Sequence, residues 1–346
     1  MPRVRLHLLT LLAGAMVGCA GAEGPVEHVS STSQAIIDGT TSPRSQNAIV
    51  QLALEGDSEG RCTASLVAKN LVLTARHCVG REEGRAEVTN FTASKLRVYT
   101  GQDAPQKIRA GDEPAAIGKK LFTASGSDMF PDVALVLLDR ELDNPVATIR
   151  LEGGVQKGEV VDIVGYGLTK SGELSDVRLQ RKGKKVTDVA PGKDPFGADL
   201  HDGEFIFGEA ACSGDSGGPA LSAASGAVIG VASRVGNGET PKDGTPNFCI
   251  GSKAIGIYTA LEAAKDIIEK AFEAAGAEPV LEDADATSTA SAKGGGDEDL
   301  LDPHSTTPVP QAGCSAAPSA AGGATSPALL LAAGLLLSQR TRRRKP

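Results

Sequence analysis

A serine surrounded by glycines is the most chemically suggestive feature of this 346-residue chain. Residues 211–219 read ACSGDSGGP, which sets Ser216 among small residues that permit a tight loop. Such a loop can direct several backbone N–H groups at one point, as a site that stabilises an oxyanion requires. The short string GDSG is a weak signal, because Gly and Ser are common in ordinary turns, but the longer string is specific. The segment therefore predicts a nucleophilic serine.

A serine nucleophile needs a base, and the central part of the chain contains two histidines. His77 follows the apolar run 71–73 and precedes Cys78, so we expect it at the end of a strand, where a disulfide could fix it. His201 lies in a polar segment that is typical of an exposed turn. We therefore expect His77 to be the base.

The elements that position these residues are short. Runs rich in Val, Ile and Leu recur between Gly, Asp, Asn and Ser, and many short strands with frequent turns predict an all-β sandwich or barrel. The runs are 49–54, 71–74, 96–100, 133–138, 160–164, 227–232 and 255–258. Residues 261–275 differ, because their apolar residues recur at helical spacing and Gly276 follows. One amphipathic helix is therefore expected to close the domain.

Composition excludes several classes of function. The chain carries 35 Lys and Arg against 43 Asp and Glu, a formal net charge of −8, so it has no domain-wide basic field for nucleic acid. It contains 42 Gly and only 3% aromatic residues, which fits a β-rich domain with many turns better than a helical bundle. The sequence shows neither a dinucleotide-binding or Walker-type loop nor a zinc-spaced His/Cys cluster. We expect no cofactor and no metal.

The N-terminal segment predicts export. Residues 1–22 combine a basic start, a short apolar run and small residues, as in a secretory signal peptide. Residues 16–19 read MVGC and resemble a bacterial lipobox in which Cys19 is lipidated, whereas residues 20–22 offer a rival cleavage site without lipid. Six cysteines are present, and four remain when Cys19 and Cys314 are set aside. In an oxidising compartment these predict two disulfides, although spacing does not choose among the three pairings.

The C-terminal segments differ from the rest in composition. Residues 277–313 hold eight acids and one lysine with little apolar surface, which predicts a disordered acidic stalk. Residues 314–346 contain Cys314, a short apolar run and an Arg cluster, and they resemble the myxobacterial C-terminal sorting tail. That resemblance implies processing near Cys314 and retention at the cell surface; the alternative is a simple tail anchor.

Two motifs together resemble the trypsin/chymotrypsin family of serine endopeptidases. They are TARHC at 74–78 and GDSGGP at 214–219. Four further strings resemble family motifs: IIDG at 36–39, DVALV at 132–136, GYG at 165–167 and GIYT at 256–259. The resemblance covers the whole domain, residues 36–276, and keeps the family's order of His, Asp and Ser.

The resemblance implies a fold of two packed six-stranded antiparallel β-barrels with a C-terminal α-helix and an active site between the barrels. It implies the disulfides Cys62–Cys78 and Cys212–Cys249. It also implies the activation of a zymogen: a cut after Ala35 removes a propeptide, residues 23–35.

The resemblance also implies roles in catalysis. Ser216 attacks the scissile carbonyl, His77 takes and returns the proton, and Asp132 orients His77. The N–H groups of Gly214 and Ser216 hold the oxyanion. In the activation switch, the freed Ile36 ammonium pairs with Asp215 in the interior.

The primary specificity pocket is assigned by the same resemblance. Its residues are Ala210, Ser233, Val235 and Gly256. Ala210 occupies the floor, where trypsin-like enzymes that cut after Lys or Arg carry Asp, unless Glu209 is displaced into the pocket. Val235 would narrow the pocket. These features predict small apolar residues, Ala or Val, before the scissile bond, and such a pocket would accept Ala35 in self-activation.

Two positions depart from the family pattern. Arg76 precedes the histidine where Ala is usual, and Arg234 replaces the Trp that usually follows Ser233.

The sequence therefore predicts an exported serine endopeptidase, cell-surface anchored or secreted, with a monomeric catalytic domain. Its expected partners are protein or peptide substrates and a membrane reached through the terminal segments, but not nucleic acid. The alternative is a catalytically silent, protease-like binding module on the cell surface, although such proteins usually lack a triad member and this chain keeps all three.

Overall fold

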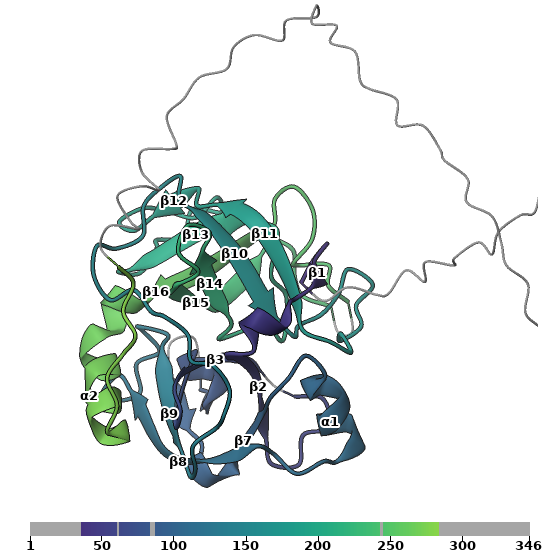
Figure 1. Ribbon diagram of the computed structural model, residues 1–346. Helices are drawn as coiled ribbons and strands as arrows, with labels where there is room; N and C mark the ends of the chain where they lie inside the picture. The colour runs from purple at the N-terminus through teal and green to yellow at the C-terminus, as the bar shows by residue number, and fades with distance from the viewer. Residues whose placement is uncertain (1–35, 61, 84–86, 243–244, 284–346) are drawn as a thin grey trace, which may run out of the picture. The chain divides into compact units, whose positions relative to one another are not determined.

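The computed structural model describes residues 36–60, 62–83, 87–242 and 245–283 (Figure 1). The expected signal peptide, Cys19, the propeptide, most of the stalk and the tail with Cys314 lie outside these residues. Within the described ranges, no helix has both the length and the apolar character needed to cross a bilayer.

The first half of the described chain forms a closed six-stranded barrel, in agreement with the expectation. Its strands follow one another in the order β2 (Ile49–Leu54), β3 (Cys62–Ala68), β4 (Leu71–Thr74), β9 (Ala134–Leu138), β8 (Ala116–Thr123) and β7 (Leu96–Tyr99). Leu66, Val72 and Val136 are paired across three neighbouring strands and are fully buried. Rows of branched apolar side chains like this one fill the barrel interior.

The second half, together with residues 40–41 from the start of the described chain, forms an eight-stranded sheet. Its order is β1 (Thr40–Thr41), β11 (Leu179–Lys185), β10 (Val160–Gly165), β14 (Pro219–Ser222), β15 (Val228–Gly236), β16 (Ile255–Ala260), β13 (Glu204–Gly208) and β12 (Asp188–Val189). The six longer strands correspond to the expected second barrel. The two-residue strands β1 and β12 extend its edges beyond the expected six.

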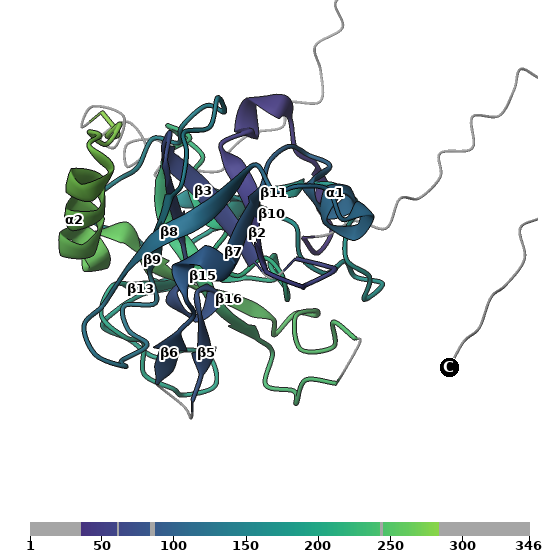
Figure 2. The ribbon, with the colours of Figure 1, turned by 90° about the horizontal axis from the view of Figure 1, so that it is seen from below.

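Two helices pack on the first barrel, on opposite sides of it (Figures 1 and 2). Helix α2 (Lys265–Ala275), preceded by the turn η4 (Leu261–Ala264), confirms the helix expected over 261–275. It contacts β4, β8 and β9, so the C-terminal end of the second half packs against the first barrel. Helix α1 (Ala104–Ala110) contacts β2 and β7 and was not expected. The smaller elements are η1 (Arg44–Gln46), η2 (Arg76–Cys78), η3 (Ala93–Lys95) and the hairpin β5 (Gly80–Glu82) and β6 (Val88–Asn90).

Two buried polar side chains join the halves. Tyr166, just after β10, places its hydroxyl 3.1 Å from the carbonyl oxygen of Ile49 and 2.7 Å from that of Gly101. Arg178 donates to the same Ile49 carbonyl at 2.8 Å. Burial raises the pKa of Tyr166 to about 12, so the hydroxyl keeps its proton and remains a donor.

The folded body extends past Gly276, which corrects the expected start of the stalk at 277. We call residues 277–282 the strap. Ile149, in the linker between the halves, donates to the carbonyl of Val280 at 2.9 Å and accepts from the N–H of Glu282 at 3.0 Å. The side chains of Arg150 and Glu282, which form an ion pair, are 5% and 3% exposed. The acidic composition predicted disorder, but these contacts order the first residues of the segment.

Replacing Glu282 by Ala is expected to destabilise the folded protein by about 3 kcal/mol, because Arg150 loses one of two carboxylate partners in a buried site. Burial alone would raise the pKa of Glu282, but hydrogen bonds from Arg150 and Ser225 lower it below 4.5. The stabilisation is therefore present above the unfolded pKa and is lost as the pH falls through the folded value. Urea unfolding at pH 7 and at pH 3 measures both effects.

The matched control is Glu278→Ala, because Glu278 is exposed on the same strap. Equal stability of the two variants at pH 7 would contradict a structural role for the ion pair.

Candidate active site

The loop that carries Ser216 connects β13 to β14 and lies against the first barrel. Thr63 on β3 donates from its hydroxyl to the carbonyl of Gly214 at 3.0 Å and from its N–H to the carbonyl of Ser216 at 2.9 Å. Gly217 has φ +74°, and a Cβ there would fall 2.1 Å from Oγ1 of Thr74 at the end of β4. Only glycine permits this approach. It brings the Ser216 loop against the residues that lead into the His77 turn.

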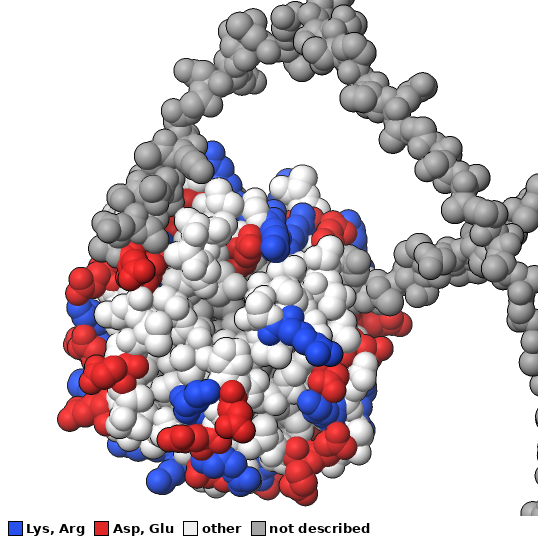
Figure 3. Space-filling model, viewed as in Figure 1, with Lys and Arg blue, Asp and Glu red and all other residues white. Residues whose placement is uncertain are grey.

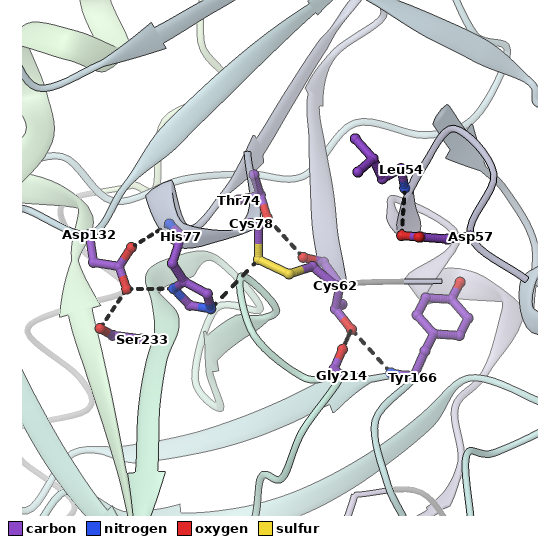
Figure 4. The surroundings of a disulfide bond; sticks show 11 residues. Leu54, Asp57, Cys62, Thr74, His77, Cys78, Asp132, Tyr166, Gly214 and Ser233 are labelled. Atoms are coloured by element: carbon purple, nitrogen blue, oxygen red, sulfur yellow. Dashed lines mark hydrogen bonds and ion pairs between the residues drawn. A yellow bond between two sulfur atoms is a disulfide. The ribbon is translucent and has the colours of Figure 1, made fainter. Parts of the chain in front are cut away.

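His77 lies in η2, directly after β4. Its Nδ1 is 2.9 Å from Oδ2 of Asp132, and its backbone N–H donates to Oδ1 at 3.1 Å. Ser233 on β15 donates to Oδ2 of the same carboxylate at 2.6 Å. Figure 4 shows the imidazole between Asp132 and the Cys62–Cys78 disulfide, with Nε2 on the side away from the carboxylate. Asp132 thus fixes the orientation of the ring.

Asp132 is fully buried, yet its carboxyl group favours the ionised form. Burial raises its pKa, but the hydrogen bond and charge of His77 and the hydrogen bond from Ser233 lower it, so that the pKa falls below 3.8. A carboxylate in this position holds the proton of the imidazole on Nδ1. The other ring nitrogen, Nε2, is then the basic one.

Both disulfides implied by the resemblance are present. Cys62–Cys78 ties β3 to the His77 turn, and Cys212–Cys249 ties the start of the Ser216 loop to the segment after β15. Sγ of Cys78 is 3.8 Å from Nε2 of His77. The sulfurs near this histidine are bonded to each other, so they offer no thiolate to a metal ion.

Two backbone donors in the Ser216 loop have no acceptor within the described part of the protein. They are the N–H groups of Gly214 and Ser216. Gly214 has φ +94°, and a Cβ there would lie 2.8 Å from Cα of Gly167. Gly214 thus lets the loop turn tightly against Gly167 and leaves both N–H groups available to an external acceptor.

The residues of the expected activation switch are buried. Ile36 and Ile37 are 0% exposed, and the N–H of Ile37 donates to the carbonyl of Ala210 at 2.9 Å. The carboxylate of Asp215 accepts from the N–H groups of Cys212 at 2.9 Å and Gly167 at 2.8 Å. Burial raises the pKa of Asp215 to about 7 despite these two bonds. Its environment would therefore be favourable to a cation.

Three of the expected pocket residues, Ser233, Val235 and Gly256, lie on the neighbouring strands β15 and β16, and Ala210 lies in the loop after β13. Val235 on β15 pairs with Gly256 on β16, and Ala210 is 1% exposed. Ser233 uses its hydroxyl on Asp132, a role that we did not assign from the sequence. Glu209 accepts from the N–H of Gly251 at 2.7 Å and forms an ion pair with Arg181, so its carboxylate is engaged by these partners.

Arg76 is the departure from the family pattern that lies nearest the site. It is 0% exposed, and its guanidinium donates to the carbonyls of Ala124 at 2.8 Å and Gly126 at 2.7 Å. These carbonyls belong to the segment that leads from β8 to Asp132. Arg76 therefore ties that segment to the turn carrying His77.

Replacing Arg76 by Ala is expected to lower the free energy of unfolding by about 3 kcal/mol, because hydrogen bonds from a charged donor to two carbonyls are lost in a buried site. Chemical denaturation would measure the loss, and Arg81→Ala, at an exposed position on β5, is the control. If the two variants unfold at the same denaturant concentration, Arg76 does not tie the segments together.

A groove of about 1050 Å³ begins at the Ser216 loop. It is lined on one side by Ser213 and Gly214, and on the others by residues that include Leu168, Leu174 and Arg109 of α1. Figure 3 shows acidic and basic side chains interspersed over one face of the body rather than gathered by sign. The groove places a surface next to Gly214, whose N–H has no acceptor in the part of the chain that the structure describes.

The chain is similar to known proteins over this body. The family model described as Trypsin matches residues 36–265. Phenoloxidase-activating factor 1 of Holotrichia diomphalia is 26% identical over 185 residues, which span 46% of this chain and 50% of that relative. Trypsin iota of Drosophila melanogaster is 28% identical over 222 residues, which span 61% of this chain and 81% of the relative. The solved structure of neuropsin, a serine protease of mouse brain, has a TM-score of 0.50 at 20% identity and covers 68% of this chain and 99% of neuropsin, which shows a shared fold.

Proposed function

The chain belongs to the trypsin family, and on that premise we propose that it is an exported serine endopeptidase that hydrolyses peptide bonds through an acyl-enzyme. The observation that carries the proposal is the buried contact of 2.9 Å between His77 and Asp132, beside a Ser216 loop packed on the same strand end. A binding module would require neither an imidazole oriented by a buried carboxylate nor a serine loop in which two N–H groups have no acceptor among the described residues.

In the proposed mechanism, Ser216 attacks the scissile carbonyl carbon while Nε2 of His77 takes its proton. Asp132 stabilises the imidazolium that forms but keeps its own charge. The N–H groups of Gly214 and Ser216 bind the oxyanion of the tetrahedral intermediate. The intermediate collapses when His77 protonates the leaving amine, and water then repeats the sequence in reverse to release the acid.

In the proposed activation, a cut after Ala35 frees the ammonium of Ile36, which pairs with Asp215. The raised pKa of Asp215 supports this, because a buried carboxylate with only two backbone donors gains most from a cation. The pair would fix the residue that lies between the two oxyanion donors. A zymogen whose oxyanion donors are not yet held in position would thereby become active.

We also propose a substrate preference from the geometry. Ala210 and Val235, with Glu209 engaged elsewhere, support a primary pocket for small apolar residues. The groove beside Gly214 supports cleavage within a chain, because it offers a surface to the residues after the scissile bond. Together they suit an endopeptidase that cuts after Ala or Val and could accept Ala35 of a second zymogen molecule.

Two disulfides fit an extracellular protein, as trypsin-like relatives generally are. We further propose that the terminal segments anchor the protein at the cell surface and that the catalytic domain acts as a monomer.

The test uses the full chain, wild type and Ser216→Ala, each cut at Ala35 by an added protease if it does not cut itself. A fluorophosphonate should label Ser216 only in the cut wild type, and a peptide library should show new ends after Ala or Val. Labelling without cleavage of any peptide would favour the silent binding module, and absence of labelling in protein with a confirmed Ile36 terminus would reject the triad.

A further inference from the structure

Phe207 on β13 lies directly opposite Gly256 on β16, and Gly256 lies opposite Val235 on β15. Residues paired in this way project from the same face of a sheet. A Cβ at Gly256 would lie 3.1 Å from Cε2 of Phe207 and 3.3 Å from Cε2 of Tyr258. The ring of Phe207 thus covers the space into which a side chain at Gly256 would extend.

The same ring is fixed in a buried apolar cluster. Phe207 and Tyr258 are 0% exposed, and their ring centroids are 4.7 Å apart. Ala210 belongs to this cluster, and Val235 packs against it. The expected floor of the primary pocket therefore belongs to the cluster that contains the Phe207 ring, and the expected wall packs against that cluster.

We propose that Phe207 determines the depth of the primary pocket, so that the enzyme accepts Ala or Val and excludes longer apolar side chains before the scissile bond. This inference rests on the proposed function. The ring takes the volume beside Gly256 that a Leu or Phe side chain of the substrate would need. Because protein interiors are close-packed and the Tyr258 ring packs against the Phe207 ring, displacing Phe207 would carry a free-energy cost that disfavours a longer substrate side chain.

The lining also determines which chemistry the pocket excludes. Within the described residues, the Tyr258 hydroxyl is buried without a hydrogen-bond partner. The Glu209 carboxylate is engaged by Arg181 and the N–H of Gly251. Among the described residues, the Glu209 carboxylate is thus held away from a Lys or Arg side chain of the substrate, and the Phe207 ring limits the depth of the pocket.

The test compares Phe207→Ala and the milder Phe207→Leu with wild type, using peptides that differ only in Ala or Leu before the scissile bond. The ratio of kcat/KM for Leu over Ala should rise by about ten-fold or more in Phe207→Ala, which is the discrimination expected for one or two methylenes in an apolar pocket. The same ratio should rise less in Phe207→Leu. The matched control is Ile206→Val, because Ile206 precedes Phe207 on the same strand but belongs to a different buried cluster, with Leu200, Ile255 and Ile257; the Leu/Ala ratio should not change in this variant.

A second variant keeps the proposal testable if Phe207→Ala does not fold. Gly256→Ala adds a methyl group 3.1 Å from the ring and should lower kcat/KM for both peptides, and Phe207→Leu should relieve part of that loss in the double variant. An unchanged Leu/Ala ratio in a Phe207 variant that still binds the fluorophosphonate overturns the inference, as does wild-type cleavage after Lys or Leu. Failure of wild type to bind the label rejects the proposed function instead.

Discussion

His77→Ala is expected to hydrolyse peptides about 10⁶-fold more slowly than the cut wild type, the scale of loss when a triad acts without its base. The reason is structural. Nδ1 of His77 bonds to a buried, ionised Asp132, which leaves Nε2 as the basic atom of the ring. Without it, Ser216 has no acceptor for its proton. The measurement is kcat with a peptide substrate, corrected for active-site concentration.

The control is His201→Ala. His201 is exposed and stacks on Phe130 at 3.5 Å between ring centroids, apart from the Asp132 carboxylate, and its loss should leave kcat within a small factor of wild type. A companion variant, Asp132→Asn, should lose about 10⁴-fold, because the amide favours the wrong imidazole tautomer. Comparable losses in the two histidine variants would place the base elsewhere.

Asp215→Asn is expected to lower kcat/KM of the cut protein by about 10² to 10³, the effect of losing an oxyanion donor. Asp215 lies between Gly214 and Ser216, and its carboxylate is held by the N–H groups of Cys212 and Gly167. An amide at this position cannot neutralise the Ile36 ammonium, so the proposed ion pair would be lost and the donors would no longer be fixed. Full activity of the cut Asp215→Asn protein would contradict the switch.

In the uncut protein, Asp215 is expected to lower the free energy of unfolding as the pH rises. Burial raises the pKa of Asp215 to about 7, above its unfolded value of 3.8, so the folded state holds the proton more tightly. The contribution of Asp215 to stability should therefore be most favourable below about pH 4 and fall by about 4 kcal/mol as the pH rises to 7. Thermal unfolding of uncut Ser216→Ala protein across this range, with and without Asp215→Asn, measures this contribution as the difference between the two pH profiles. Identical profiles would contradict it.

The strands could be predicted because apolar runs and turn residues are local signals, and all seven runs lie in or overlap strands. Helix α1 could not, because a segment of seven residues is too short to show helical periodicity. Ile108 is buried, and the helix ends at Gly111 with φ +72°. The strap was missed for a different reason. Its order depends on Arg150, 132 residues away, and a charged contact at that distance leaves no mark on composition.

At the candidate site, the motifs located the candidate catalytic residues but not the residues that position them. His77 and Asp132 are in contact as the resemblance implied. Ser233 was assigned to the pocket, whereas its hydroxyl bonds Asp132, which only the strand register reveals. Phe207 resembles any apolar strand residue in the sequence. Its importance arises from the glycine opposite it, a cross-strand relation that one sequence does not display.

The strap also has a mechanical consequence. Its hydrogen bonds to Ile149 run between parallel segments, and Ile149 is in turn bridged in parallel to Val228 on β15. A pull along the chain beyond Asp283 would load both strap bonds and the Arg150–Glu282 ion pair at once, in shear. Tension would then pass to the linker between the halves and into β15, the strand that carries Ser233. If the protein is anchored through its C-terminal segment, as proposed, a pulling force from a bound substrate would act on the strands that carry the active-site residues.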